Sequence, residues 1–282
     1  MLVRKCFKQI VSLASYSTSA SAVTTKMIEE RGVRTITLSN PKSRNALSLS
    51  TINELIGHVT TDVEDIKLRC IVIRAEGPVF CSGHNLKEFD LNSTQQQHQR
   101  LVFSQCSQLM LDIVSCPVPV VAVVDGLAAA AGCQLVAQCD IAICTPHSSF
   151  STPGASFGLF CSTPGIPVAR SVSRKMALRM LLTGLPITAE EAYQAGLVSK
   201  VVPQESLETE LKIITDSIES KSRTVISLGK KFFYKQVETD LQTAYRMGED
   251  VMVSNIALED GQEGIKSFIE KRKPSWKHAS VK

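Results

Sequence analysis

The sequence lacks the features of several common protein classes. No apolar run in its 282 residues approaches the roughly 18–20 residues that cross a bilayer, so no membrane span is predicted. The nine cysteines include no C-x-x-C pair and no spacing typical of zinc ligands. Their odd number and scattered positions favour reduced thiols in an intracellular compartment over a disulfide framework. The sequence therefore predicts neither a metal site nor a disulfide scaffold.

An excess of positive charge is also missing once the N-terminus is set aside. Four of the 31 lysines and arginines lie in residues 1–26, which leaves 27 against the 27 acidic residues of the chain. Binding to phosphate backbones needs clustered positive charge, so no nucleic-acid partner is predicted. No G-x-G-x-x-G motif follows a strand, which argues against a dinucleotide fold.

The N-terminal segment contains no acidic residue. Arg4, Lys5, Lys8 and Lys26 are its bases, and serines alternate with apolar residues between them. This composition is typical of a mitochondrial transit peptide. We therefore predict a transit peptide over residues 1–26 and a mature protein in the mitochondrial matrix.

A run of very small side chains follows an apolar strand predicted over Val118–Val124. Ala128–Ala131 and Gly132 leave the first N–H groups of a helix without side chains to shield them. Such donors, helped by the helix dipole, suit a carbonyl oxygen that becomes negative in a reaction. Close packing of the helix on the strand is the alternative reading of the same residues.

A second loop offers a similar donor. Arg69–Ala75 is predicted as a buried strand, and Gly83 clears space beside the N–H group of His84. Each loop leaves a strand and carries an N–H group beside a glycine. We therefore expect the two loops to converge on one oxygen as an oxyanion hole.

The remaining pattern indicates an α/β protein. It predicts a hairpin at Lys26–Ser39, helices at Leu49–Asp65 and Leu101–Ser115, strands near Ile141–Cys144 and Val198–Val202, and helices from Gln204 onward. Asn92–Arg100 is expected to be a polar connection.

Five segments together carry a resemblance to a known family. They are CSGHNLKEF (81–89), DGLAAAAGCQLVAQCDIAI (125–143), FSTPGASFGLFCSTPG (150–165), LTGLPITAEEAYQAGLVSKVVP (182–203) and EGIKSFIEKRKPSW (263–276). In order and spacing, from about Met27 to Trp276, the chain resembles the enoyl-CoA hydratase/isomerase family, also called crotonases. The resemblance implies a spiral core of ββα units over 27–203. It also implies a C-terminal helical region of the same fold over 204–282, which mediates assembly as a trimer or a hexamer.

The resemblance implies an acyl-CoA thioester as the ligand. The oxyanion hole would be formed by the N–H groups of His84 and Ala131. Family hydratases carry glutamates where this chain has Gln134 and Gly154. An amide cannot take a proton from water at neutral pH, and glycine has no side chain. We therefore expect hydratase activity to be weak or absent, although the oxyanion hole is kept.

Two alternatives to a hydratase stay open. A histidine at the position of His84 resembles some family decarboxylases, in which the enolate forms without a base, although its imidazole could simply pack at the rim of the pocket. The second alternative is a non-catalytic acyl-CoA binder with a regulatory role. Cys133, Cys161, Ser162 and Thr163 either line the pocket or fill the core.

Contacts to coenzyme A are implied at both ends of the chain. The turn-like segment 41–47, with Lys42, Arg44 and Ala46, resembles the family loop beside the nucleotide, and Ser82 lies in the oxyanion loop. Phe268 and Lys271 match positions that reach the adenine across a subunit boundary. Solvated surface cations are the alternative for Lys42 and Arg44. Coenzyme A enters as part of the substrate, no further cofactor is predicted, and the family implies a role in fatty acid metabolism.

Overall fold

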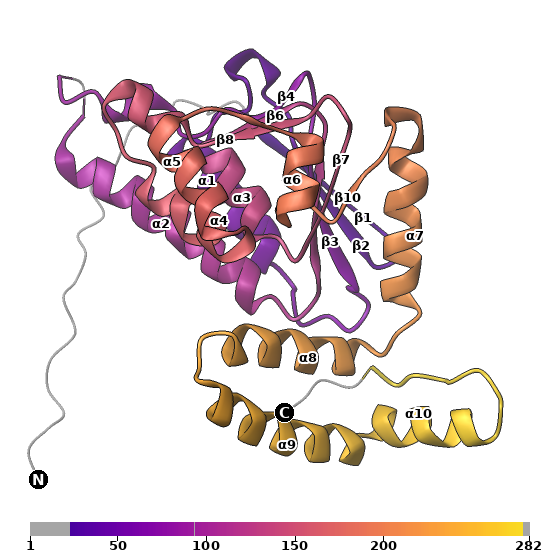
Figure 1. Ribbon diagram of the computed structural model, residues 1–282. Coiled ribbons are helices and arrows are strands. Elements are labelled where there is room, and N and C mark those ends of the chain that lie inside the picture. The colour runs from indigo at the N-terminus through magenta and orange to yellow at the C-terminus, as the bar shows by residue number, and fades with distance from the viewer. Residues whose placement is uncertain (1–22, 93, 279–282) are drawn as a thin grey trace, which may run out of the picture.

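A computed structural model describes residues 23–92 and 94–278 (Figure 1). The strands are β1 (Thr25–Glu30), β2 (Val33–Leu38), β3 (Cys70–Ala75), β4 (Val79–Cys81), β5 (Val120–Val124), β6 (Leu127–Ala129), β7 (Ile141–Cys144), β8 (Ser149–Ser151), β9 (Ile187–Thr188) and β10 (Lys200–Val201). The α-helices are α1 (Leu49–Thr60), α2 (Gln96–Ser115), α3 (Ala131–Gln138), α4 (Ser162–Ser171), α5 (Arg174–Thr183), α6 (Ala189–Ala195), α7 (Leu207–Glu219), α8 (Arg223–Gln236), α9 (Leu241–Ala257) and α10 (Glu259–Ile269). Short 3₁₀ turns are η1 (Pro41–Ser43), η2 (Leu86–Phe89), η3 (Pro153–Phe157) and η4 (Gln204–Ser206).

The strands form two sheets that the chain visits in alternation. The larger sheet has the order β1-β2-β3-β5-β7-β10, and the smaller has the order β4-β6-β8-β9. β3, β5 and β7 each run into a strand of the smaller sheet, namely β4, β6 and β8, before a helix returns the chain. Three successive ββα turns of this kind confirm the predicted spiral. Each turn also places a strand-to-helix loop at the smaller sheet.

Both faces of the larger sheet are covered, which explains its continuous apolar strands. Figure 1 shows α1 to α5 on one side of this sheet and α7 on the other. In β5, Val120, Ala122 and Val124 pack in the main core, whereas Val121 and Val123 face a second cluster that includes Leu207 and Leu211 of α7. Side chains alternate between the faces of a strand, so one apolar run serves both cores.

The C-terminal helices α8, α9 and α10 lie apart from the two sheets (Figure 1). α9 has no buried residue in the single chain, and α8 buries only Arg223 and Thr224 at its start. Lys230 of α8 binds Asp140, which immediately precedes β7, and this ion pair ties the helical region to the core. Within the described residues no helix is long and apolar enough to cross a membrane.

The structure corrects several element boundaries. Leu49–Asp65 is helical only to Thr60, and the polar span that we expected to be a connection contains the first turn of α2, from Gln96. The chain is helical after Gln204 only as far as Ile269, because residues 270–278 contain no helix. Part of the predicted small-residue helix start is strand β6, and α3 begins at Ala131.

The predicted transit peptide lies mostly outside the described residues. Its last two residues, however, belong to β1, which starts at Thr25. Thr25 is buried, and its hydroxyl donates to Glu54 at 2.7 Å. The folded body therefore begins before residue 27, the expected start of the core.

Candidate active site

Two loops meet closely at the edge of the smaller sheet, as the small residues predict. A Cβ built on Gly83 would lie 2.8 Å from the Ala130 Cβ and 3.4 Å from the backbone nitrogen of Ala131. Gly83 also has a φ of +98°, which L side chains rarely adopt. On the other loop, a Cβ on Gly132 would lie 2.4 Å from the carbonyl oxygen of Cys81. Both glycines are therefore required by the contact between the loops.

The N–H groups beside this contact have no hydrogen-bond acceptor among the described residues. His84 lies between Gly83 and Asn85, whose backbone groups pair with Leu47, while its own N–H group makes no such bond. Ala131 is the first residue of α3, so its N–H group has no partner inside the helix. The preceding residue, Ala130, has a φ of +48°, an uncommon value outside glycine. The geometry thus leaves two backbone donors available side by side.

Polar side chains close to these donors are buried without partners. Gln134, in the first turn of α3, is 3% exposed, and its Oε1 has no hydrogen-bond partner among the described residues. The hydroxyl of Thr152, next to β8, is fully buried and equally without a partner. Leaving such a group unpaired costs about 1–3 kcal/mol. These atoms are therefore available to a ligand or to water.

Gly154, the second position where the resemblance implies a missing glutamate, has no room for a side chain. A Cβ on Gly154 would lie 2.3 Å from the carbonyl oxygen of Leu159 and 2.7 Å from the Sγ atom of Cys161. The Gly154 N–H group donates to the same sulfur at 3.3 Å. Cys161, 8% exposed, is the N-cap residue of α4.

The imidazole of His84 packs against aromatic rings. It makes edge contacts with Phe89, at 5.6 Å between ring centres, and with Phe103, at 5.2 Å. Both ring nitrogens are buried without a hydrogen-bond partner. Burial lowers the pKa of His84, and the backbone of Leu47 and the Glu88 carboxylate oppose this effect only in part. The ring is therefore neutral at neutral pH, which does not favour a role as a cationic acid.

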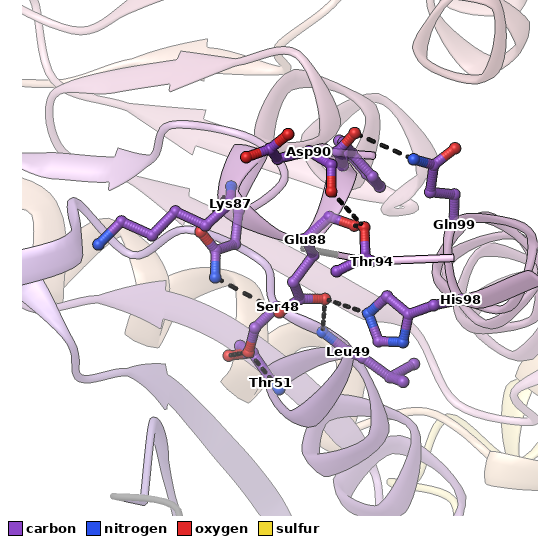
Figure 2. A network of polar contacts seen from close by, with 11 residues as sticks. Ser48, Leu49, Thr51, Lys87, Glu88, Asp90, Thr94, His98 and Gln99 are labelled. Carbon is purple, nitrogen blue, oxygen red and sulfur yellow. Dashed lines mark hydrogen bonds and ion pairs between the residues drawn. The ribbon is translucent and has the colours of Figure 1, made fainter. Parts of the chain in front are cut away.

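The loop after His84 is anchored by Glu88 (Figure 2). Its Oε2 atom accepts a hydrogen bond from the backbone N–H of Leu49, at the start of α1, at 3.1 Å, and lies 3.4 Å from Nε2 of His98 in α2. Gln99 donates to the carbonyl of Phe89 at 3.0 Å. These contacts hold η2 against α1 and α2, and so fix the position of His84.

The segment predicted to border the nucleotide runs beside the oxyanion loop. Ser82 donates its backbone N–H to the carbonyl of Arg44 at 3.1 Å, and Leu47 donates to that of Gly83 at 2.8 Å. Lys42 and Arg44 are exposed, while Ala46 is half-buried between them and the loop. The structure thus brings the predicted cations of η1 to the same edge as the oxyanion donors.

The other two predicted coenzyme A contacts lie elsewhere in the single chain. Phe268, 86% exposed, belongs to α10 in the separate helical region (Figure 1). Lys271 follows the end of this helix, and its N–H group donates to the carbonyl of Phe268 at 3.2 Å. Neither residue is brought to the oxyanion loops of its own chain.

Sequence reasoning missed Thr152 and the placement of Cys161. A threonine and a cysteine carry no signal of their own, because both are common in cores. The absence of a side chain at Gly154 was the signal available, since it leaves a space that some neighbour fills. Among the described residues no cluster of three His, Cys, Asp or Glu side chains could hold a metal ion.

Comparisons with known proteins agree with this geometry. A family model described as enoyl-CoA hydratase/isomerase matches residues 28–279. Enoyl-CoA hydratase domain-containing protein 3, mitochondrial, of Homo sapiens is 55% identical over 250 residues, covering 89% of this chain and 82% of that protein. The Danio rerio protein of the same name is 44% identical over 272 residues, or 96% and 94% of the two chains. Their names confirm the predicted mitochondrial location.

Solved structures share the fold over the same region. The crystal structure of human enoyl coenzyme A hydratase domain-containing protein 3 has a TM-score of 0.88 at 52% identity, covering 90% of this chain and 100% of that one. The enoyl-CoA hydratase of Mycobacterium smegmatis has a TM-score of 0.87 at 40% identity, covering 90% and 99%. These matches confirm the fold implied by the five sequence segments, and the chain belongs to the enoyl-CoA hydratase/isomerase family.

Proposed function

We propose that this protein binds an acyl-CoA thioester and stabilises its enolate. The thioester oxygen accepts hydrogen bonds from the N–H groups of His84 and Ala131. The observation that carries the proposal is the contact at Gly83, which sets two unpaired backbone donors beside each other. Donors fixed in place before the reaction stabilise developing negative charge without reorganising.

Ordinary hydration is not the activity that this site supports. The Oε1 atom of Gln134 can accept a hydrogen bond from a water molecule, but an amide does not remove its proton at neutral pH. Gly154 supplies no acid, and Leu159 leaves no space for one. Each missing group is worth roughly 10²–10⁴-fold in rate. Hydratase activity is therefore expected to be weak or absent.

A CoA-thioester decarboxylase is the second candidate. Loss of carbon dioxide leaves an enolate directly, so the reaction needs the oxyanion donors but no base. The neutral imidazole of His84, with both nitrogens unpaired, is compatible with such a role. A non-catalytic acyl-CoA binder uses the same donors and is distinguished only by the absence of product.

Calorimetric titration of the protein with butyryl-CoA tests binding, and incubation with malonyl-CoA and crotonyl-CoA under mass detection tests turnover. We expect binding with a dissociation constant in the micromolar range or below, which corresponds to at least about 8 kcal/mol. Absence of heat, together with no protection from thermal unfolding, would refute the proposed function.

We further propose that the helical region assembles the protein as a homotrimer, which can stack into a hexamer. Its exposed apolar side chains, including Leu241, Tyr245, Met252, Val253 and Phe268, need a covering surface. In a trimer, Phe268 and Lys271 reach coenzyme A bound to a neighbouring copy. Light scattering should give a trimer for the wild type and smaller species for Tyr245→Glu.

The location and pathway complete the proposal. The basic, acid-free segment within residues 1–26 directs the protein to the mitochondrial matrix, and because β1 starts at Thr25 the part that is removed is expected to end before β1. There the protein serves fatty acid metabolism, with coenzyme A entering as part of its ligand and no other cofactor. A fluorescent protein fused behind residues 1–26 should appear in mitochondria, and a diffuse cytosolic signal would contradict this address.

A further inference from the structure

We propose that the Cys161 thiol is the proton-transfer group of the acyl-CoA site, standing where the side chain that Gly154 lacks would be. The inference rests on the proposed function and names one reactive side chain within it. It assigns to this site a chemistry that a carboxylate carries out in hydratases.

One hydrogen bond and one close approach place the sulfur beside Gly154. Its distance of 2.7 Å from a Cβ built on Gly154 means that the thiol occupies the first part of the path that a longer side chain would take. The N–H group of Gly154 donates to the same Sγ at 3.3 Å. The sulfur therefore lies beside Gly154, in the space where a side chain at that position would begin.

Unpaired polar atoms mark the same region as a ligand site. The Gln134 side chain is only 3% exposed, and its Oε1 has no hydrogen-bond partner among the described residues. Cys133 is the residue before Gln134, and its pKa is raised to about 12. Burial is the main cause, and the nearby Cys161 is the second. The hydroxyl of Thr152, two residues before Gly154, is fully buried and unpaired. Thr152 is thus close in sequence to Gly154, which contacts the sulfur, and Gln134 adjoins Cys133, whose pKa Cys161 affects.

The electrostatic surroundings suit a thiol that gives up and regains a proton. Burial raises the pKa of Cys161, so the thiol is protonated at neutral pH, while the Gly154 N–H group opposes the shift. Once formed, the thiolate is stabilised by this N–H group; it also lies at the N-terminus of α4, although its side chain makes no capping hydrogen bond there. The raised pKa keeps the thiol, the proton-donating form, as the resting state.

The proton-transfer step balances without a further reactant. The Cys161 S–H bond breaks and a C–H bond forms at the carbon next to the thioester, using the electron pair of the enolate double bond. The carbonyl is restored, the sulfur keeps the S–H electron pair as thiolate, and water then returns a proton to it with release of hydroxide. In reverse, the thiolate removes a proton from a saturated acyl-CoA.

Exchange of that proton for deuterium tests the proposal directly. The full chain is incubated with butyryl-CoA in D₂O, and deuterium at the carbon next to the thioester is followed by mass spectrometry. We expect exchange in the wild type, and a loss of roughly 10²-fold in Cys161→Ser. Serine is a favourable N-cap residue, so this variant should fold and should still bind butyryl-CoA in the calorimeter.

Cys161→Asp and Cys144→Ser provide the matched controls. Aspartate is also a good N-cap residue, and a carboxylate ionises at lower pH than a thiol at the same site, so it should restore exchange and shift the pH dependence of the rate to lower pH. The wild-type rate should rise with pH as the thiolate forms. Cys144, a buried thiol at the end of β7, should tolerate serine with unchanged exchange.

The outcomes separate this inference from the proposed function. Normal calorimetric binding with no exchange in the wild type would overturn the role of Cys161 and leave the binding proposal intact. Wild-type exchange in Cys161→Ser, or an equal loss in Cys144→Ser, would overturn it as well. Absence of butyryl-CoA binding by the wild type would instead refute the proposed function on which the inference depends.

Discussion

Two polar clusters in this protein, one partly and one fully buried, differ in how completely their atoms are paired. At the junction with the helical region, Asp140 accepts hydrogen bonds from Lys230 at 2.6 Å, from the Val120 N–H at 2.7 Å and from the Tyr234 hydroxyl at 2.8 Å. Lys230 also donates to the carbonyls of Ile113 and Val118. At the oxyanion loops, by contrast, the side-chain oxygen atoms of Gln134 and Thr152 are buried without any partner.

The difference separates a structural cluster from a binding site. All three ammonium protons of Lys230 are used, so a ligand has nothing to gain there. The unpaired atoms at the oxyanion loops weaken the fold, and a ligand that pairs them recovers that free energy on binding. A search for a binding site by charge beneath the surface would have selected Asp140, whereas a search for unpaired polar atoms selects Gln134.

Breaking the paired cluster should produce the largest change in stability. Lys230→Met leaves the partly buried Asp140 carboxylate without its cation, and the expected loss is about 3 kcal/mol in the free energy of unfolding, the lower end of the range for buried pairs. Denaturant unfolding measures this loss. Lys175→Met, at an exposed site on α5, is the control and should change little. Equal stabilities for the two variants would show that the Asp140 cluster does not hold the helical region to the core.

Adding carboxylates to the unpaired cluster should produce the next largest effect. Gln134→Glu together with Cys161→Asp should raise crotonyl-CoA hydration on the order of 10²-fold, followed by the loss of enoyl absorbance. Gly154→Glu should instead destabilise the protein, because its Cβ would lie 2.3 Å from the Leu159 carbonyl oxygen. Crotonyl-CoA turnover by the wild type at about 10 per second or faster would show that Gln134 and Gly154 are not disabling.

Removing the unpaired amide should have the opposite sign from removing Lys230. Gln134→Met replaces a buried polar group that has no partner for Oε1, and we expect a gain of about 1 kcal/mol in unfolding free energy. Gln138→Met in the same helix is the matched control. A loss of stability in Gln134→Met would mean that its amide is paired after all.

The smallest effect concerns pH. Burial lowers the pKa of His84 below its ordinary value of 6.5, so the unfolded chain binds a proton more readily than the folded one. Stability from this group is therefore complete above about pH 6.5 and is lost as the pH falls toward the folded pKa. His84→Phe should keep the ring packing and reduce the loss of stability between pH 7.5 and 5.5. An unchanged pH dependence would contradict the burial of this imidazole.

The sequence predicted features that depend on neighbouring residues, and it missed features that depend on contacts between distant residues. Local patterns identified the six strands of the larger sheet and the close approach of Gly83 to Ala131, because apolar runs and small side chains are visible in neighbouring residues of the sequence. The polar first turn of α2 was missed, since its order depends on His98 meeting Glu88 and on Gln99 meeting Phe89. The partners of Asp140 were missed for a similar reason, because Lys230 lies 90 residues away in the chain. Pairing across such separations leaves no periodicity to read.

The proposed active site was likewise predicted only in part. The glycine at position 154 indicated in the sequence that a carboxylate is missing. The sequence did not show that the Leu159 carbonyl leaves no room for a side chain there, or that the Cys161 sulfur lies next to Gly154. Those facts depend on how the turn between η3 and α4 closes. Short strands such as β6 and β8 were missed because three residues give too little alternation to recognise.

The central claim is that the N–H groups of His84 and Ala131 hold a thioester oxygen. Calorimetry with butyryl-CoA and with S-butyl-CoA, a thioether that lacks only this oxygen, tests the claim most directly. Two lost hydrogen bonds of about 1 kcal/mol each should weaken binding of the thioether by roughly tenfold or more. Equal affinities for the two ligands would contradict the oxyanion hole, because the oxygen would then contribute nothing to recognition.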